Sequence, residues 1–383
     1  MVAVTALSLG RPTWAEIDLS RLVSNLNTFK QILPSGVRIM AVIKADAYGH
    51  GAYEVSRVAL REGVSMLGVA SLEEGLDLRR KGINSPILIL GYTDPRQYYL
   101  VVENDLTTTI FHWEMASLLS DQAQAAGKRV PIHVKLDTGM NRLGLLEPTK
   151  IMAFLDKLSA LPGIWVEGLF THFATADELE NDFLQEQMQK FNKIIRESKK
   201  RGMHIPLMHA ANSAAAACFP QSHLDMVRIG IGMYGYYPSA AISREKFKLY
   251  PVLSLKSRII LLKKIYPGAT ISYGRTFTAT KETLIAVVPI GYGDGYSRQL
   301  SNKGVMLVHG QEVPVVGHVC MDLTMLDVGS VPDAREGDEV VVYGKQGLGE
   351  IMVEKVAEQL GTISYELLCN ISSRIPRIYT GSA

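Results

Sequence analysis

The sequence predicts an α/β protein with an N-terminal (β/α)8 TIM-like barrel and a C-terminal, mostly antiparallel β domain. Eight short apolar runs alternate with helical spacing through the first 235 residues, and near residue 245 the pattern changes to strand-like runs separated by turns. The chain of 383 residues is long enough for two domains with sizeable cores. We place the barrel at 1–245 and the β domain at 246–383.

The eight predicted barrel strands are short runs rich in β-branched residues. They lie at 37–44, 66–70, 86–90, 106–111, 131–136, 164–170, 206–211 and 226–231. Apolar residues between them recur with helical spacing, as at Leu184, Met188, Phe191 and Ile195. Strands that alternate with helices pair in parallel, and eight such units are the number that closes a barrel.

In the C-terminal part the apolar runs are separated by turns rather than by helices, which predicts antiparallel strands. The runs lie at 253–262, 283–293, 304–310, 313–321 and 338–344. Helical patterns return late, around 353–360 and 365–370, and the segment 236–251 has the composition of a linker.

Composition favours a small-molecule partner in the cytoplasm. Apolar residues make up 47% of the chain and charged residues 20%, and the net charge of +2 has no long run of one sign to attract nucleic acid. Three widely spaced cysteines suggest reduced thiols, and the first residues lack a signal-peptide pattern. No apolar stretch approaches the 18 or so residues that a membrane span requires.

Polar residues gather where the predicted barrel strands end, which is where barrel enzymes build their active sites. Five of the eight strands contribute: Lys44, Lys135, Asp137, Arg142, His172, Asn212, Ser213 and Arg228. Any one of them could be polar without having a function, because polar residues commonly begin where a buried strand ends. Five strands together favour a site.

Lys44 ends a fully apolar strand, where we expect burial to lower the pKa of its ammonium and to favour a neutral amine that attacks a carbonyl. The alternative is a lysine whose stem is buried and whose head reaches solvent. Barrels commonly bind phosphate after strands seven and eight, where Ser213 and the segment Gly230–Gly232 lie. The two together indicate a phosphate-bearing carbonyl cofactor.

Three other readings are disfavoured. Residues 230–235 satisfy G-x-G-x-x-G, but they lead into Tyr236-Tyr237-Pro238 rather than a helix, so a dinucleotide site is not expected. The nine histidines show no metal-ligand spacing. No G-x-S-x-G elbow supports a serine hydrolase.

An ordered series of motifs along the whole chain resembles the alanine racemase family. The segment 41–51, AVIKADAYGHG, is similar to that family's cofactor-lysine motif almost letter for letter. Further matching segments lie at 14–18, 135–140, 171–177, 226–230, 272–274, 289–295 and 319–322.

The resemblance implies an isomerase that interconverts L-alanine and D-alanine with pyridoxal 5′-phosphate (PLP). Lys44 would hold the cofactor aldehyde as a Schiff base and act as the base on the D face, and Tyr273 would act on the L face. In the family this tyrosine reaches the barrel of the other subunit, which implies a head-to-tail homodimer. Two bases suit racemisation, since the proton leaves one face and returns to the other. Their ordinary pKa values of about 10 must fall for work near neutral pH.

The resemblance also assigns the residues that hold cofactor and substrate. The phosphate would be bound by Tyr48, Ser213, Gly230 and Ile231. Arg142 and the backbone around Met321 would hold the substrate, Tyr292 would lie at the entrance, and Lys135 would be carbamylated and steady Arg142.

Arg228 would hydrogen-bond the pyridine nitrogen of the cofactor, with His172 behind it. Arginine only donates, so the nitrogen that faces it must be an unprotonated acceptor. The ring is then a weaker electron sink than one paired with a carboxylate, which limits side reactions. Taken alone, Arg228 is equally compatible with a structural salt bridge.

This sequence departs from the family pattern at three positions. Ser373 stands where some members have a tyrosine beside the phosphate, which leaves room for a larger substrate such as serine. Asn141 and Gly293 replace a common glycine and a common alanine, respectively.

The function expected is therefore alanine racemisation that supplies D-alanine for peptidoglycan. The closest alternative is an alanine/serine racemase of broad specificity. A PLP decarboxylase would be expected to place an acidic residue where Arg228 stands, and a non-catalytic PLP-binding barrel would lack the β domain and Tyr273.

Overall fold

The computed structural model describes residues 10–178, 182–238, 242, 244–245 and 247–381. The chain divides into two compact units. The barrel unit comprises Leu22–Ala47 and Ala52–Tyr250, and the β unit comprises Met1–Arg21, Tyr48–Gly51 and Pro251–Ala383. The predicted division at 245/246 differs from these units in residues 1–21, 48–51 and 246–250. Part of the predicted linker (239–241, 243 and 246) lies outside the described residues.

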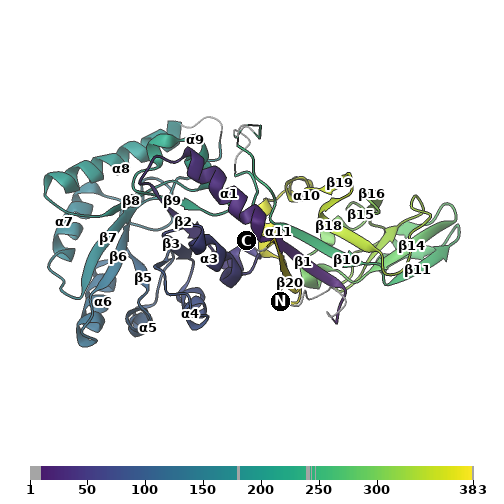
Figure 1. The fold of residues 1–383 in the computed structure, drawn as a ribbon, viewed down its shortest axis with the longest axis horizontal. Coiled ribbons are helices and arrows are strands. Elements are labelled where there is room, and N and C mark those ends of the chain that lie inside the picture. Colours follow the sequence, from purple (N-terminus) through teal and green to yellow (C-terminus); the bar gives the residue numbers. More distant parts are fainter. Residues whose placement is uncertain (1–9, 179–181, 239–241, 243, 246, 382–383) are drawn as a thin grey trace. The chain divides into compact units, whose positions relative to one another are not determined.

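All eight predicted barrel strands are present, so the predicted barrel is confirmed (Figure 1). They are β2 (Arg38–Val42), β3 (Met66–Val69), β4 (Ile87–Ile89), β5 (Thr107–Ile110), β6 (Val130–Lys135), β7 (Ile164–Phe170), β8 (Leu207–His209) and β9 (Met226–Ile229). Neighbours pair in parallel in the order β8-β7-β6-β5-β4-β3-β2-β9. The backbone N–H groups of Asp225 and Arg228 donate hydrogen bonds to the carbonyls of Met208 and Ala211, respectively. These bonds join β9 to β8 and close the sheet.

Helices alternate with the barrel strands as the periodicity predicts, with α1 ahead of the first of these strands. They are α1 (Leu19–Ile32), α3 (Ala52–Arg61), α4 (Leu72–Arg80), α5 (Tyr98–Glu103), α6 (Trp113–Ala125), α7 (Pro148–Leu158), α8 (Asp182–Lys200) and α9 (Ser213–Cys218). In α8 the apolar positions Leu184, Met188 and Phe191 are buried, which is the face that the spacing indicates. Inside the unit, Met40, Met66, Leu88, Leu207 and Met226 from five strands form one core cluster.

The β unit contains a seven-stranded sheet and a three-stranded sheet. The first holds β1 (Thr13–Asp18), β10 (Leu253–Arg258), β15 (Val305–Val308), β16 (Gln311–Pro314), β18 (Glu339–Gln346), β19 (Gly349–Ile351) and β20 (Arg377–Thr380). The second holds β11 (Leu261–Ile265), β14 (Thr283–Val288) and β17 (Thr324–Asp327). Short strands β12 (Thr270–Ile271) and β13 (Phe277–Thr278) pair separately, and α10 (Val353–Leu360) and α11 (Ser364–Cys369) match the late helical patterns.

Two details of the β unit differ from the prediction. Strand β1 pairs antiparallel with β10 and parallel with β20, so residues near the N-terminus complete the sheet of this unit. The predicted strand at 313–321 is wrong beyond Pro314, because the left-handed Gly317 (φ 75°) ends the extended backbone, and Met321 consequently lies in a loop.

Among the described residues, no helix has the length and apolar character needed to cross a bilayer.

Candidate active site

Among the described residues of the barrel unit, Arg228 on strand β9 is the most deeply buried charged group, with 3% of its surface exposed. Its Nη1 donates to Nδ1 of His209 at 3.0 Å. Its Nη2 donates to Nδ1 of His172 at 3.0 Å and to the carbonyls of Thr171 and Ala210 at 2.9 and 2.8 Å. None of these four bonds uses Nε. Within the described part of the chain, no carboxylate lies within ion-pair distance of this guanidinium.

A chain of buried imidazoles leads away from Arg228. Nδ1 of His209 must be an acceptor because arginine only donates, so Nε2 of His209 carries the proton and donates to Nδ1 of His133 at 2.8 Å. Nε2 of His133 then donates to the carboxylate of Glu167 at 3.1 Å. Burial, then the neighbouring His133 and Arg228, hold the pKa of His209 well below its usual value. The chain therefore joins Arg228 to a carboxylate through two neutral rings.

His172, which follows strand β7 (Ile164–Phe170), has a pKa well below its usual value. Burial is the largest cause of its lowered pKa, followed by the charges of Arg228, Arg142, Lys135 and Lys44. All four are residues that the sequence predicts for the site. A neutral His172 accepts from Arg228 without adding a further positive charge.

Lys135 ends strand β6 with 6% of its surface exposed. Its ammonium donates to the carbonyl of Leu136 at 2.8 Å. Burial, and then Arg228 and Arg142, lower the pKa of Lys135 to about 7, although Asp137 acts in the opposite direction. A neutral amine is therefore abundant at physiological pH.

Asp137 shapes the loop that carries Arg142. Its carboxylate accepts from the backbone N–H groups of Gly139, Asn141 and Arg142 at 2.9, 3.0 and 3.0 Å. Asn141 is left-handed (φ 54°), a conformation that glycine and asparagine adopt more readily than other residues. The replacement of the family's common glycine therefore preserves this turn.

Ser213 and the glycine segment after β9 come together at the predicted phosphate site. Ser213 Oγ accepts from the N–H groups of Gly230 and Gly232 at 2.9 and 3.3 Å, and Asn212 caps α9 by accepting from the N–H of Ala215. A Cβ at Gly232 would lie 2.5 Å from the ring of Phe29, so only glycine fits this close approach. A hydroxyl beside backbone N–H groups suits a phosphate, so these residues fit the predicted cofactor.

Lys44 follows β2 but is exposed, so the expected burial of its ammonium is wrong. The reason is local: strand β2 ends at Val42, and after Ile43 the chain enters a left-handed turn, labelled α2 (Lys44–Tyr48). Ala45 is the first left-handed residue at φ 52°, and Tyr48, at φ 54°, is the last before Gly49, whose φ is 80°.

In the β unit, Tyr273, Tyr292 and Met321 lie in three segments that are hydrogen-bonded to one another. Tyr273 is 73% exposed, and its neighbour Ser272 donates to the carbonyl of His318 at 2.7 Å. Tyr292 donates its backbone N–H to the carbonyl of Cys320 at 3.1 Å, and is 43% exposed. Met321 follows Cys320 and is 53% exposed. Tyr273, Tyr292 and Met321 are thus all attached to the loop at 315–323.

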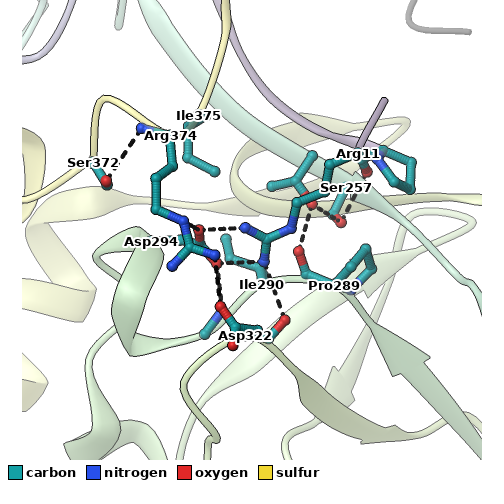
Figure 2. A network of polar contacts seen from close by, with 12 residues as sticks. Arg11, Ser257, Pro289, Ile290, Asp294, Asp322, Ser372, Arg374 and Ile375 are labelled. Atoms are coloured by element: carbon teal, nitrogen blue, oxygen red, sulfur yellow. Dashed lines mark hydrogen bonds and ion pairs between the residues drawn. The ribbon is translucent and has the colours of Figure 1, made fainter. Parts of the chain in front are cut away.

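An ion-pair network braces the loops that carry Tyr292 and Met321 (Figure 2). Arg11 forms a bidentate pair with the fully buried Asp294 at 2.6 and 2.7 Å. Arg374 pairs with Asp322 at 2.6 Å and approaches Asp294 at 3.7 Å. The Asp294 carboxylate also accepts from the N–H of Gly291 at 3.0 Å.

Tyr48 belongs to the β unit, where its ring packs against Tyr365 with centroids 5.7 Å apart. Arg377 donates to the carbonyls of Gly49 and Ile371 at 3.0 and 2.8 Å, which ties the Tyr48 segment to the loop before β20. A Cβ at Gly49 would lie 2.3 Å from the carbonyl oxygen of Leu368, which explains the glycine there.

Sequence reasoning missed His133, His209, Glu167 and Arg377. The first two lie in apolar strands, where a single histidine usually indicates core. Two signals were available. His133 lies two residues before Lys135, on the same face of β6, and His209 lies at the polar end of β8.

The fold and site define a barrel enzyme whose predicted phosphate site, buried arginine and strand-end lysine suit PLP chemistry. Residues 17–238 match the alanine racemase N-terminal domain, and residues 252–379 match the alanine racemase C-terminal domain. The chain belongs to the alanine racemase family, whose members use PLP.

Individual relatives cover nearly the whole chain. An alanine racemase of Desulfosudis oleivorans is 45% identical, covering 96% of each chain, and one of Methanococcus maripaludis is 44% identical, covering 97% of this chain and 99% of the relative. The solved alanine racemase of Clostridium difficile 630 has a TM-score of 0.93 at 41% identity, covering 97% and 96%. That of Bacillus anthracis, solved with bound L-Ala-P, has a TM-score of 0.92 at 39% identity, covering 98% and 97%.

We expect Arg11→Met to destabilise the β unit by about 3 kcal/mol, because the buried carboxylate of Asp294 loses its bidentate partner. Urea unfolding measures this change. Replacing Trp113 and Trp165 by phenylalanine leaves Trp14, on β1, as the fluorescent reporter of this unit.

The matched control is Lys264→Met in the same unit, which removes a solvent-exposed pair with Glu282 and should change stability by less than about 1 kcal/mol. Equal effects of the two substitutions would show that the Arg11–Asp294 pair does not brace the unit.

We expect His172 and His209 to stay neutral at pH 6, with the proton on Nε2, because burial lowers both pKa values. A histidine in an unfolded chain titrates near 6.5, so below that pH the unfolded state takes up protons that the folded state does not. The two residues therefore make the fold less stable as the pH falls. Ring ¹⁵N chemical shifts of the cofactor-free protein test this, and double protonation of His209 at pH 6 would refute it.

Proposed function

We propose that this chain interconverts L-alanine and D-alanine by a two-base mechanism. Lys44 acts on the D face, and Tyr273 of a second copy of the chain acts on the L face. The observation that carries the proposal is the surroundings of Arg228, which donates to imidazoles and carbonyls and has no carboxylate partner among the described residues. Such a group supplies hydrogen bonds to a ring nitrogen but no proton.

The cofactor is proposed to be held through three groups. Lys44 forms the covalent link, Ser213 with the backbone of Gly230 and Ile231 binds phosphate together with Tyr48, and Arg228 donates to the pyridine nitrogen. Nε of Arg228 takes no part in the four bonds described above and is the donor we assign to this nitrogen. PLP, when bound, draws electrons from the substrate Cα and so makes its proton easier to remove.

Arg228 keeps its charge in this site and limits proton transfer to the ring. Burial, followed by Arg142, lowers its pKa to about 9, so the guanidinium stays protonated at neutral pH. A permanent donor leaves the ring nitrogen as an acceptor. This supports racemisation over decarboxylation, because a moderate electron sink favours return of the proton to Cα.

Arg142 and the backbone around Met321 are proposed to hold the substrate carboxylate, and Tyr292 to line the entrance. Asp137 fixes the loop of Arg142 through three backbone bonds, which orients the guanidinium before substrate arrives. Ser373 is exposed and small, which favours acceptance of serine as a second substrate.

A head-to-tail homodimer is part of the proposal because Tyr273 acts on another chain. The exposure of Tyr273, Tyr292 and Met321 on one part of the β unit supports it, because neighbouring exposed apolar side chains suit an interface. We further propose that the enzyme works in the cytoplasm and supplies D-alanine for peptidoglycan.

The central test follows the racemisation of L-alanine and L-serine by the PLP-loaded protein. Lys44→Ala should abolish the covalent link to the cofactor. Tyr273→Phe should keep that link but lose exchange of the Cα proton of L-alanine with deuterated solvent, because the phenol that removes it is missing. Tyr266→Phe, another exposed tyrosine of the β unit, is the matched control and should retain activity. Failure of the wild-type protein to racemise either substrate would refute the proposal.

Mixing the Lys44→Ala and Tyr273→Phe proteins tests the shared site. Random reassembly makes half of the dimers mixed, each with one intact site, so about a quarter of the wild-type activity should return. If both groups act within one chain, the mixture stays inactive.

We propose that Lys135 is carbamylated. Its neutral amine attacks CO₂, a nitrogen–carbon bond forms, and the displaced proton passes to solvent. The resulting anion replaces an amine that lies among the charges of Arg142 and Arg228, where a negative group is favourable.

The carbamate should form as the pH rises through about 7, because burial and Arg228 lower the pKa of Lys135 to about that value and free its amine there. The ¹³C signal of protein equilibrated with labelled bicarbonate measures this, and Lys135→Arg should remove the signal. A signal that appears only above pH 9, as for an ordinary exposed lysine, would contradict the assignment.

A further inference from the structure

The turn that follows β2 is unusual because four consecutive residues other than glycine are left-handed. Ala45, Asp46 and Ala47 have φ of 52°, 52° and 54°, with ψ between 47° and 52°, and Tyr48 has φ 54°. Left-handed backbone is unfavourable for residues with a Cβ and occurs mostly at single positions. Local preference therefore opposes this turn, and contacts from elsewhere in the fold must impose it.

Glu74, on helix α4, makes two of those contacts. Its Oε1 accepts from the backbone N–H of Ala45 at 2.7 Å, and its Oε2 accepts from the backbone N–H of Ala70 at 2.7 Å. Ala45 lies just after β2, and Ala70 lies just after β3. One carboxylate thus joins the ends of two neighbouring barrel strands, beside Lys44.

The local sequence would favour a different role for Glu74. Residues 71–74 read Ser-Leu-Glu-Glu, the pattern of a capping box in which the glutamate bonds the N–H of the capping residue. Ser71 does cap the helix by accepting from the N–H of Glu74. The Glu74 carboxylate instead accepts from the N–H groups of Ala70 and Ala45. The second hydrogen bond of a capping box is therefore replaced by a contact with the left-handed turn.

Two further bonds hold the remainder of the turn. Asp46 accepts from the N–H of Ala52 at 2.7 Å, and Ala47 donates to the carbonyl of Ile43 at 2.8 Å. Glu74 acts at the first left-handed residue, directly after Lys44, where the chain changes from extended to left-handed backbone. Without the Glu74 carboxylate, the backbone of Ala45 would lose this hydrogen bond. The conformation of Ala45 helps to set the direction of the neighbouring Lys44 side chain.

We propose that Glu74 is a positioning residue for Lys44, holding the left-handed turn from which the lysine reaches the cofactor. This rests on the proposed function, in which Lys44 forms the covalent link. Glu74 touches neither cofactor nor substrate in this scheme and acts through the backbone of Ala45.

The test compares Glu74→Gln with the matched control Glu73→Gln. The glutamine amide keeps one acceptor oxygen but turns an NH₂ group toward the second N–H, so one of the two charge-assisted bonds is lost. Glu73 carries the same charge on the same helix, and the contacts with Ala45 and Ala70 come from Glu74. We expect Glu74→Gln to weaken cofactor binding roughly tenfold and to lower the fraction of Lys44 trapped by borohydride reduction, because charged hydrogen bonds are the strong ones.

A rescue variant separates positioning from general damage to the fold. Ala45→Gly removes the Cβ that makes the left-handed conformation unfavourable, so it should recover most of the trapping and affinity in the Glu74→Gln protein. Ala45→Gly alone should bind cofactor at least as well as the wild-type protein. If the glycine gives no recovery, Glu74 does not act through this turn and the proposal is overturned.

A measurement without cofactor keeps this inference distinct from the proposed function. In the cofactor-free protein, Glu74→Gln should raise the hydrogen-exchange rates of the Ala45 and Ala70 amides roughly tenfold relative to Glu73→Gln. If the wild-type protein never links PLP to Lys44, the proposed function fails. If the link forms and Glu74→Gln matches Glu73→Gln in trapping and exchange, the positioning role fails alone.

Discussion

The buried charge of Arg228 constrains the barrel unit more than any other single group. A guanidinium taken out of water needs several acceptors, and an unpaired buried charge is among the most destabilising features a fold can contain. Here the acceptors are two histidine rings and two strand-end carbonyls, so β7, β8 and β9 must end in register with one another. The histidines must be neutral, which their burial among cations ensures. Glu167, at the far end of the imidazole chain, supplies a negative charge without placing a carboxylate beside Arg228.

The β unit meets the opposite problem, a fully buried carboxylate, in a more direct way. Asp294 receives two bonds from Arg11 and one from the backbone of Gly291. Arg11 lies just before β1, so pairing of β1 with β10 and β20 carries the arginine to its partner across most of the chain. In each unit, long-range strand pairing is what satisfies the buried charge.

Much of this architecture could be predicted because it depends on residues that are close together in the sequence. Each barrel strand is a β-branched apolar run, and Lys44, Lys135, Arg142, Ser213 and Arg228 follow or belong to such runs. What escaped prediction depends on distant partners. The place of β1 in the C-terminal sheet leaves no local sign, and His133 and His209 resemble core residues until their mutual bond is seen. Lys44 was expected to be buried because its strand is apolar, yet the chain turns at the next residue, and a left-handed run without glycine has no sequence signature.

Asn141 and Gly293, which depart from the family pattern, differ in how strongly the neighbouring side chains depend on them. Asn141 occupies a left-handed position that asparagine tolerates, so exchange with glycine leaves the neighbouring bonds to Asp137 in place. Gly293 is different, because a Cβ there would lie 2.6 Å from Nη1 of Arg374 and 3.1 Å from the carbonyl of Met321. Arg374 takes its present position, bonded to Asp322, in the space that the glycine leaves. A chain with alanine at this place must hold its arginine differently, so the glycine and the ion-pair network behind Met321 form one unit of structure.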